Sequence, residues 1–592
     1  MLNARTYIPI LFLVLVALTT LVVSNDFYTN IIINLFYYAT LSLAWNLLGG
    51  YAGQFSLGHA AFLGLGAYTS TLLFLHFNIT PWLGMLVGAV FASIIGALVF
   101  WPCFRLKGFY FCLATIAFAE VLRILATHWR SLTKGGVGLL LPVKPSLYNL
   151  LFTSKYPYLW LSLLLLLGTM GISYLIERSR LGYSLKALRD DEEGAEAAGV
   201  NVFRSKLAAS VISAFITAIA GTFYVQYMLY IEPEIVFSMH LSLQMSLFAI
   251  IGGIGTIAGP IVGAFILVPL DIALKGWLGS LYAGLGFIVY GGLLILVVML
   301  IPEGIIQWLR PKLERLYQKL PSPDVERKGK AVQLQRKPET PAGLKDADKP
   351  LLELTGVNKS FKGLKVLNDI SFTIFPGELV GLIGPNGAGK TTLFNVITKF
   401  LPLDSGKIFL GGDDITPFHG PHEVCYQGIS RTFQIVRPFS SLSVLENVTV
   451  GALARNPKPQ EAEELAREII FLCGLEKYAD HQVASLTLAF RKRLEFARAL
   501  ATQPRLLLLD EVMAGLNPRE MEEMIRLLDT ISGRGVTLLI VEHVMQVIMG
   551  VCQKILVLNY GNLIATGTPE EIYQNPQVIE AYLGDLGEEI EC

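Results

Sequence analysis

The chain contains 592 residues, of which 53% are hydrophobic and only 16% are charged, whereas a soluble globular chain carries about 25% charged residues. Its 47 basic and 47 acidic side chains give no net charge, which excludes nucleic-acid binding through a basic field. The composition also excludes a disordered chain, and the length predicts several domains.

The first 300 residues contain long stretches without a charged side chain, at 27–104, 156–176 and 235–270. A helix needs about 20 apolar residues to cross a bilayer. The sequence therefore predicts a multi-span α-helical membrane domain with about eight to ten crossing or re-entrant helices. The candidate spans are Tyr7–Val23, Phe27–Leu48, Leu57–Leu75, Leu83–Phe100, Phe109–His128, Tyr158–Ile176, Lys206–Leu229, Leu241–Leu270, which we expect to be broken, and Ala283–Ile301.

A few polar side chains interrupt these apolar stretches. Gln54, Ser56 and His59 either satisfy the backbone at the ends of a broken helix or face a pathway, and we expect the first role for His59. Glu120 and Arg123 are three residues apart on one predicted helix, so they are expected to form an ion pair.

The composition changes after residue 309. Residues 310–350 are rich in Lys, Arg and Pro, which predicts a linker that lies in the cytoplasm because basic residues beside a span favour that side. A second basic loop, residues 178–206, is expected on the same side. The predicted domains are therefore residues 1–309 in the membrane, the linker 310–350, and a soluble domain from 351 to 592.

The soluble domain reads as α/β, with short apolar strands that alternate with amphipathic helices. Its first buried strand, Leu379–Ile383, runs into a Gly-rich loop and then a helix. This GxxxxGKT pattern predicts a P-loop, whose backbone N–H groups and helix N-terminus bind phosphate. The nucleotide-binding residues are Gly384, Pro385, Asn386, Gly387, Ala388, Gly389, Lys390, Thr391 and Thr392. Lys390 is expected to contact the β- and γ-phosphates and Thr391 to bind Mg²⁺.

Four leucines followed by Asp510 and Glu511 form the second half of this predicted site. Asp510 at the end of the buried strand is expected to complete the magnesium shell. Glu511 stands beside it, in place to polarise the water that attacks the γ-phosphate. The sequence thus predicts an α/β P-loop NTPase domain with ATP and Mg²⁺ as cofactors.

These motifs resemble, in order, those of an ABC transporter nucleotide-binding domain. The resemblance implies that Phe361 stacks on adenine, that Gln434 touches Mg²⁺ and the membrane domain, and that His543 contacts the γ-phosphate. Ala514–Asn517 matches the D-loop of the family. The resemblance therefore implies an ATP-hydrolysing domain.

One motif departs from the family. The signature LSGGQ reads Leu-Thr-Leu-Ala-Phe at residues 486–490. The resemblance implies that the signature acts in trans, on the ATP site of the partner subunit. Thr487 keeps a hydroxyl for the γ-phosphate there, whereas Ala489 carries a methyl group where glycine allows a close backbone approach. We therefore expect two unequal ATP sites, and comparable hydrolysis after disabling either P-loop would count against this.

The membrane half resembles permeases of hydrophobic amino acid importers, the LivM type, at residues 50–63, 132–138 and 252–260. A charged loop at about 183–201 resembles the coupling helix of ABC importers, although a solvated connector would have a similar composition. The ATPase half resembles the LivG type. The unusual feature is the fusion of both in one chain.

The resemblance implies an ATP-driven importer of branched-chain or other hydrophobic amino acids in the cytoplasmic (inner) membrane, multi-pass, with its ATPase domain in the cytoplasm. Its implied partners are a second permease, a second ABC ATPase, an external solute-binding protein and membrane lipid. The same architecture carrying urea or short amides stays an alternative. Two rival interpretations are an ABC exporter half and a non-transporting membrane scaffold with a decayed nucleotide site. The short loops disfavour the exporter. The scaffold is disfavoured by the intact nucleotide-site residues Lys390, Asp510, Glu511 and His543.

Overall fold

The computed structural model describes residues 25–106, 108–278 and 349–588, together with single residues and short pieces at 16–18 and 288–309. The chain divides into two compact units. The first unit comprises residues 1–185 and 203–326, and the second comprises residues 186–202 and 327–592. Most of the predicted spans Tyr7–Val23 and Ala283–Ile301, and most of the linker 310–350, lie outside the described residues.

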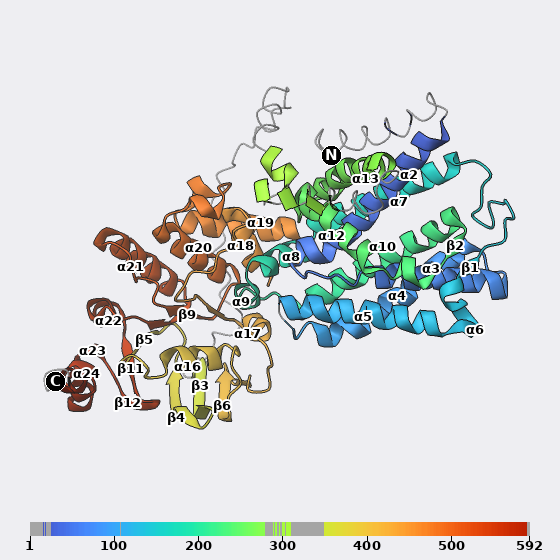
Figure 1. Ribbon diagram of the computed structural model, residues 1–592. Coiled ribbons are helices and arrows are strands. Elements are labelled where there is room, and N and C mark those ends of the chain that lie inside the picture. The colour runs from blue at the N-terminus through green and yellow to red at the C-terminus, as the bar shows by residue number, and fades with distance from the viewer. Residues whose placement is uncertain are drawn as a thin grey trace. The chain divides into compact units, whose positions relative to one another are not determined.

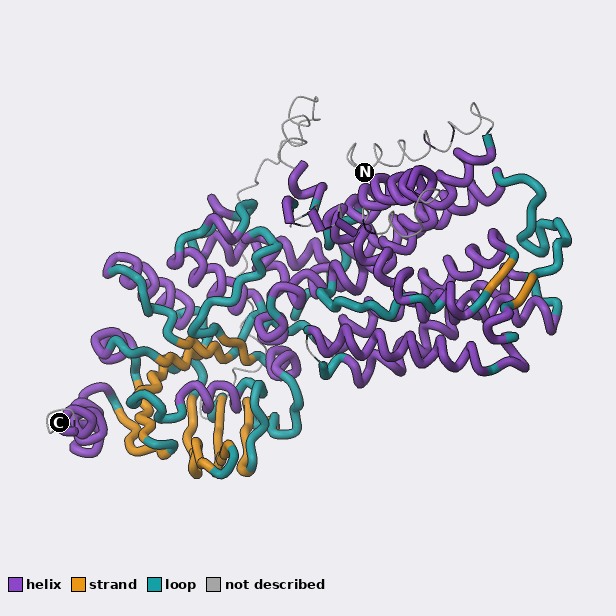
Figure 2. Tube along the Cα trace, in the orientation of Figure 1, coloured by secondary structure: helices purple, strands orange, loops and turns teal. Residues whose placement is uncertain are grey.

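The first unit is helical (Figures 1 and 2). Its elements are α2 (Asp26–Asn46), the π-helical turn η1 (Leu47–Tyr51), α3 (Ala60–Phe77), α4 (Pro81–Cys103), α5 (Phe109–His128), α6 (Arg130–Thr133), η2 (Gly135–Val137), α7 (Tyr156–Glu177), α8 (Arg180–Asp190), α10 (Val202–Met228), α11 (Pro233–Val236), α12 (Met239–Gly253) and α13 (Ala258–Leu278). The short strands β1 (Leu139–Leu140) and β2 (Tyr230–Ile231) pair antiparallel.

Seven helices in the part of the chain that the structure describes are long and apolar enough to cross a membrane, and one shorter apolar helix covers Ala258–Leu274. The predicted stretch Leu241–Leu270 is indeed broken, because α12 ends at Gly253 and α13 begins at Ala258. Asn46 holds this break: its Oδ1 accepts the N–H of Gly255 and its Nδ2 donates to the carbonyl of Thr256, both at 2.9 Å. Side-chain bonds to freed backbone groups make such a break stable in an apolar environment.

The second unit contains a six-stranded sheet in the order β12-β11-β5-β10-β9-β8. The strands are β5 (Leu379–Ile383), β8 (Ile429–Arg431), β9 (Leu506–Asp510), β10 (Thr537–Val541), β11 (Lys554–Asn559) and β12 (Asn562–Gly567). All neighbours are parallel except β11 and β12. Every residue of β5, β9 and β10 is buried, as apolar strands at the centre of a parallel sheet must be. The predicted mostly parallel sheet is confirmed.

A four-stranded antiparallel sheet, in the order β4-β3-β6-β7, was not predicted. Its strands are β3 (Leu352–Phe361), β4 (Leu364–Ile374), β6 (Ser405–Leu410) and β7 (Asp413–Asp414), and Figure 1 shows β3, β4 and β6 side by side. The helices of this unit are α9 (Glu192–Ala197), α16 (Lys390–Ile397), α17 (Pro421–Gln427), α18 (Val444–Ala452), α19 (Pro459–Leu472), α20 (Leu488–Ala501), α21 (Pro518–Ser532), α22 (Met545–Val551), α23 (Pro569–Tyr573) and α24 (Pro576–Glu588). Helices α18, α19 and α20 pack on one another.

Candidate functional site

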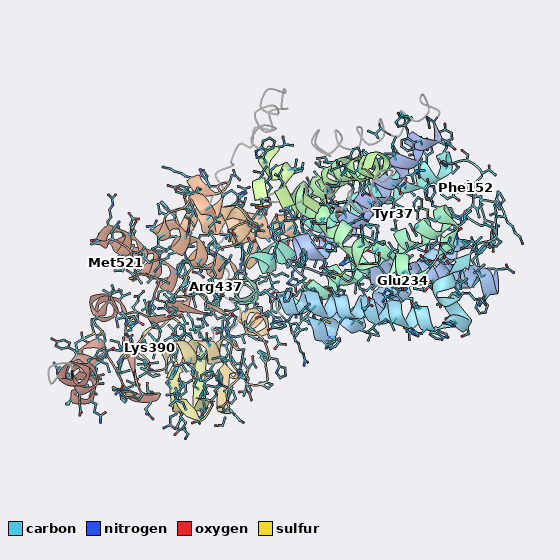
Figure 3. The ribbon with its side chains drawn as sticks, viewed as in Figure 1. Tyr37, Phe152, Glu234, Lys390, Arg437 and Met521 are labelled. Carbon is cyan, nitrogen blue, oxygen red and sulfur yellow. The ribbon has the colours of Figure 1, made fainter. Side chains whose placement is uncertain are left out.

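The predicted P-loop connects β5 to α16, and Figure 3 labels its lysine. Gly384, Gly387 and Gly389 have φ values of 151°, 79° and 104°, a region that favours glycine. A Cβ atom on Gly384 would lie 2.1 Å from the carbonyl oxygen of Leu558. The loop therefore closes tightly over the N-terminus of α16, which is the geometry that presents backbone N–H groups to phosphate.

Lys390, the first residue of α16, lies inside this loop. Its ammonium donates to the carbonyl of Gly384 at 2.6 Å and to that of Pro385 at 2.9 Å. Burial lowers the pKa of Lys390, while the carboxylates of Glu511 and Asp510 act in the opposite direction. The loop thus holds a cation that faces two acids, as expected for a group that contacts phosphate beside a metal site.

Three predicted residues meet at the end of β9. The Nε2 of Gln434 donates to Oε1 of Glu511 at 3.1 Å, and Nε2 of His543 lies 3.1 Å from the same oxygen. Glu511 has a φ of 48°, and its N–H donates to the carbonyl of Val541 at 2.9 Å. The strained backbone turns the carboxylate toward the two other side chains. A carboxylate, an amide and an imidazole thus converge at one place, as orientation of a water molecule requires.

Asp510 ends β9 beside this cluster. Its N–H donates to the Thr432 hydroxyl at 3.2 Å, and its Oδ2 lies 3.5 Å from Nη2 of Arg431. Burial raises the pKa of Asp510, and the guanidinium of Arg431 opposes this rise. Oδ2 is buried and makes no hydrogen bond to any other described residue. A buried carboxylate oxygen that lacks a hydrogen bond, with Thr391 on the first turn of α16, fits the oxygen ligands that Mg²⁺ prefers.

Three residues around the site were missed by the sequence analysis. Lys492 of α20 is buried, and its ammonium donates to the carbonyls of Glu511 at 2.8 Å and Ala514 at 2.6 Å. Glu542 accepts the N–H of Met513 at 2.7 Å. Arg431 ends β8, and its guanidinium lies beside the carboxylate of Asp510. Lys492 lies between Arg491 and Arg493 in the sequence, so nothing in the pattern of its own helix distinguishes it, and its partners come from another loop.

Phe361 and the signature lie elsewhere in this unit. Phe361 ends β3 with 42% of its surface exposed, so its ring is accessible for stacking. Thr487 is exposed immediately before α20, and Ala489 is buried. Phe490 packs on Tyr478 with 4.6 Å between ring centroids. An aromatic residue packed within the unit therefore replaces the amide that the family signature carries here.

The charged segment at 186–202 belongs to the second unit. The carboxylate of Asp190 accepts the N–H of Ser441 at 2.7 Å. Asn201 hydrogen-bonds to Nε2 of His422 at 2.8 Å. Segment 186–202 therefore contacts residues on both sides of Gln434 in the chain, His422 before it and Ser441 after it.

His59 is buried in the first unit, and both ring nitrogens are bonded. Ser213 donates to the carbonyl of Ala44 at 2.6 Å and lies 2.9 Å from Nε2 of His59, while Ser56 lies 3.1 Å from Nδ1. Because the hydrogen of Ser213 is used, Nε2 donates and Nδ1 accepts from Ser56. His59 therefore bonds two hydroxyls, which in turn bond the carbonyl of Ala44 and the N–H of Gly58. Its side chain supports backbone groups indirectly, through these two serines.

The ion pair predicted in α5 is present. Nε of Arg123 donates to Oε2 of Glu120 at 3.0 Å. Arg123 also binds Glu234 of α11, which was not predicted because Glu234 is 111 residues away in sequence. One arginine therefore joins two carboxylates, and through them α5 to α11.

Both halves of the chain are similar to known families. Residues 27–301 match the family described as "Branched-chain amino acid transport system / permease component". Residues 367–514 match "ABC transporter", and residues 562–586 match "Branched-chain amino acid ATP-binding cassette transporter".

Several relatives match the second unit over nearly their whole length. The high-affinity branched-chain amino acid transport ATP-binding protein LivG of Escherichia coli K12 is 39% identical over 252 residues, which is 40% of this chain and 98% of LivG. BraF of Pseudomonas aeruginosa is 38% identical, over 40% of this chain and 99% of BraF. Among solved structures, a nucleotide-free ATP-binding cassette from an ABC transporter has 29% identity and a TM-score of 0.37, over 40% of this chain and 99% of that one.

Proposed function

Because the chain belongs to the family of branched-chain amino acid ABC transporters, with a permease and an ATP-hydrolysing domain in one polypeptide, we propose that it imports branched-chain or other hydrophobic amino acids. It is a multi-pass membrane protein of the inner membrane with a cytoplasmic ATPase domain. The observation that carries the proposal is the permease match over residues 27–301 in the same chain as an ATP-binding half that is 39% identical to LivG.

The ATP site supports hydrolysis by this chain's own residues. The loop from Gly384 to Gly389 binds the phosphates, and Lys390 adds a positive charge within it. Mg²⁺, when bound by Thr391 and Asp510, supplies charge neutralisation at the γ-phosphate. Glu511 accepts a proton from the attacking water, whose position Gln434 and His543 fix through their shared contact with Oε1. Phe361 stacks on the adenine ring.

Import, rather than export, is the proposed direction. It is supported by the contacts that segment 186–202 makes near Gln434. The proposed partners are a second permease, a second ABC ATPase and an external solute-binding protein. Thr487 and Ala489 would then act on the ATP site of the second ATPase, and the altered signature would make that site the slower one.

The experiment reconstitutes the chain with these partners in proteoliposomes, with ATP inside and binding protein outside. We expect uptake of labelled leucine, with unlabelled valine and isoleucine as competitors. Urea and acetamide should leave the uptake unchanged. Inhibition of leucine uptake by urea or acetamide alone would favour the alternative substrate class, and ATP-driven loss of leucine from preloaded vesicles would favour an exporter.

A further inference from the structure

Arg437, which Figure 3 labels, lies three residues after Gln434 and contacts the segment that joins α7 to α10. Its Nη1 lies 2.9 Å from Oε2 of Glu193 and 3.2 Å from Oδ2 of Asp191. Its guanidinium also stacks on Phe433, 4.9 Å from the ring centroid. One side chain therefore joins the neighbour of Gln434 to two acids of segment 186–202.

The backbone of Arg437 is held from the other side by the helix that follows the signature. Nη1 of Arg498 donates to the carbonyl of Arg437 at 2.6 Å. Arg498 is buried, stacks on Phe439 at 4.4 Å and lies 3.4 Å from the buried Glu495 of α20. The position of Arg437 is thus fixed by buried groups, whereas its own side chain stays 33% exposed. A guanidinium that is held in place, and stacked on an aromatic ring, presents its charge to the carboxylates at a defined position.

The acids of the segment are fixed as well. Asp191 is the N-cap of α9, where its Oδ1 accepts the N–H of Gly194 at 2.5 Å. Asp190 binds the N–H of Ser441. Glu193 lies on the first turn of the same helix and is 48% exposed. Two acids, Asp191 and Glu193, therefore face one arginine, and the charges are complementary.

We propose that Arg437 is a positioning residue that transmits the state of the ATP site to the coupling segment of its own chain. Gln434 touches Glu511, and Arg437 holds Asp191 and Glu193. Segment 186–202 ends at Val202, the first residue of α10. A shift of the Gln434 loop is thereby passed to the membrane helices through one guanidinium. This inference rests on the proposed function, since it assigns how that ATPase drives that permease.

The ion pairs of Arg437 also specify that segment 186–202 docks on the ATPase domain of its own chain. Because both charges belong to one chain, a charge reversal on one side should be corrected by a reversal on the other side of the same chain. If the segment instead docked on the second ATPase subunit, a change at Arg437 could not be corrected in this way. Asp191 is left unchanged in the test because its carboxylate also caps α9.

The test compares the full chain with Arg437→Glu, Glu193→Arg, both together, and Arg437→Lys, each assembled with its partners in vesicles. Arg437→Glu should lower uptake per ATP hydrolysed by about tenfold, since it replaces partly exposed attractions with repulsions. The double variant should recover at least about threefold of this loss. Arg437→Lys should fall between, because lysine keeps the charge but loses the planar group that stacks on Phe433. Arg467→Glu is the matched control, since its partner Glu463 lies on the same exposed helix face.

A second readout does not depend on the transported solute. Hydrogen exchange of residues 186–202 in the full chain should accelerate in Arg437→Glu, return toward wild type in the double variant and stay unchanged in Arg467→Glu. A double variant no better than Arg437→Glu, or equal behaviour of the two Arg→Glu variants, would overturn the inference. If the wild type takes up no leucine but the variants show this exchange pattern, the proposed substrate is rejected and the role of Arg437 is retained.

Discussion

Replacement of Lys492 by methionine should reduce ATP hydrolysis through the backbone of Glu511. The Lys492 ammonium is buried and donates to the carbonyls of Glu511 and Ala514. Burial lowers the pKa of Lys492, and the carboxylates of Glu542 and Glu511 are the largest opposing influences. Methionine keeps most of the side-chain volume but leaves both carbonyls without their donor.

The magnitude follows from those two bonds. Both hydrogen bonds are partly buried, so the loss of each should cost about 1 kcal/mol and the variant should lose about 2 kcal/mol of stability. Glu511 already has a φ of 48°, so release of its carbonyl allows the carboxylate to move away from Gln434 and His543. A displacement of about 1 Å costs a rate factor of roughly 100. We therefore expect kcat for ATP hydrolysis to fall by about two orders of magnitude.

The assay measures ATP hydrolysis by the assembled transporter, together with thermal unfolding. Lys399→Met is the matched control, because Lys399 is also buried and donates to a backbone carbonyl, that of Thr416 at 3.2 Å. It should lose stability without a comparable loss of kcat. If Lys492→Met and Lys399→Met lose activity only in proportion to stability, Lys492 does not position Glu511 and the reasoning fails.

Two further predictions concern other parts of the chain. Asn46→Leu should lower the melting temperature more than Asn46→Asp. Leucine loses the hydrogen bonds to both Gly255 and Thr256, whereas aspartate keeps an acceptor for the N–H of Gly255. Equal melting temperatures of the two variants would contradict this role of Asn46. Burial raises the pKa of Glu542 from about 4.5 to about 6, with the Lys492 ammonium opposing the rise. The native state then binds the proton more tightly, so Glu542 should cost about 2 kcal/mol of stability as the pH rises from about 4.5 to 6. Glu542→Gln should remove this part of the pH dependence of unfolding, and an unchanged pH profile would refute it.

The ATP site was predictable because its motifs are local in sequence. A buried strand, a Gly-rich loop and a helix follow one another from Leu379 to Ile397, so their geometry depends on neighbouring residues. Gln434, Glu511 and His543 are separated by several helices and strands. Local sequence patterns could not bring them together, so their convergence was expected only from the resemblance to the family. The contacts of Lys492 with a distant loop have no counterpart in the pattern of its own helix.

In the membrane half, the sequence predicted the positions of the spans but not the side-chain contacts between them. The stretches without charged residues located the membrane helices. The Gly-rich run near Gly252 indicated the break before α13. The residue that holds this break, Asn46, is 209 positions from Gly255. Likewise, Glu120 indicated an ion pair with Arg123, whereas the second carboxylate comes from Glu234. Helical spacing reveals partners within one helix only.

The central claim is that ATP hydrolysis at this chain's own site drives import. The most direct measurement compares labelled leucine uptake by vesicles that contain wild type with uptake by vesicles that contain Glu511→Gln, with ATP inside and binding protein outside. The account predicts ATP-dependent uptake that Glu511→Gln lowers by about 100-fold or more, while ATP still binds. Uptake that is equal in the two preparations would contradict the account, because Glu511 would then have no part in the reaction that powers transport.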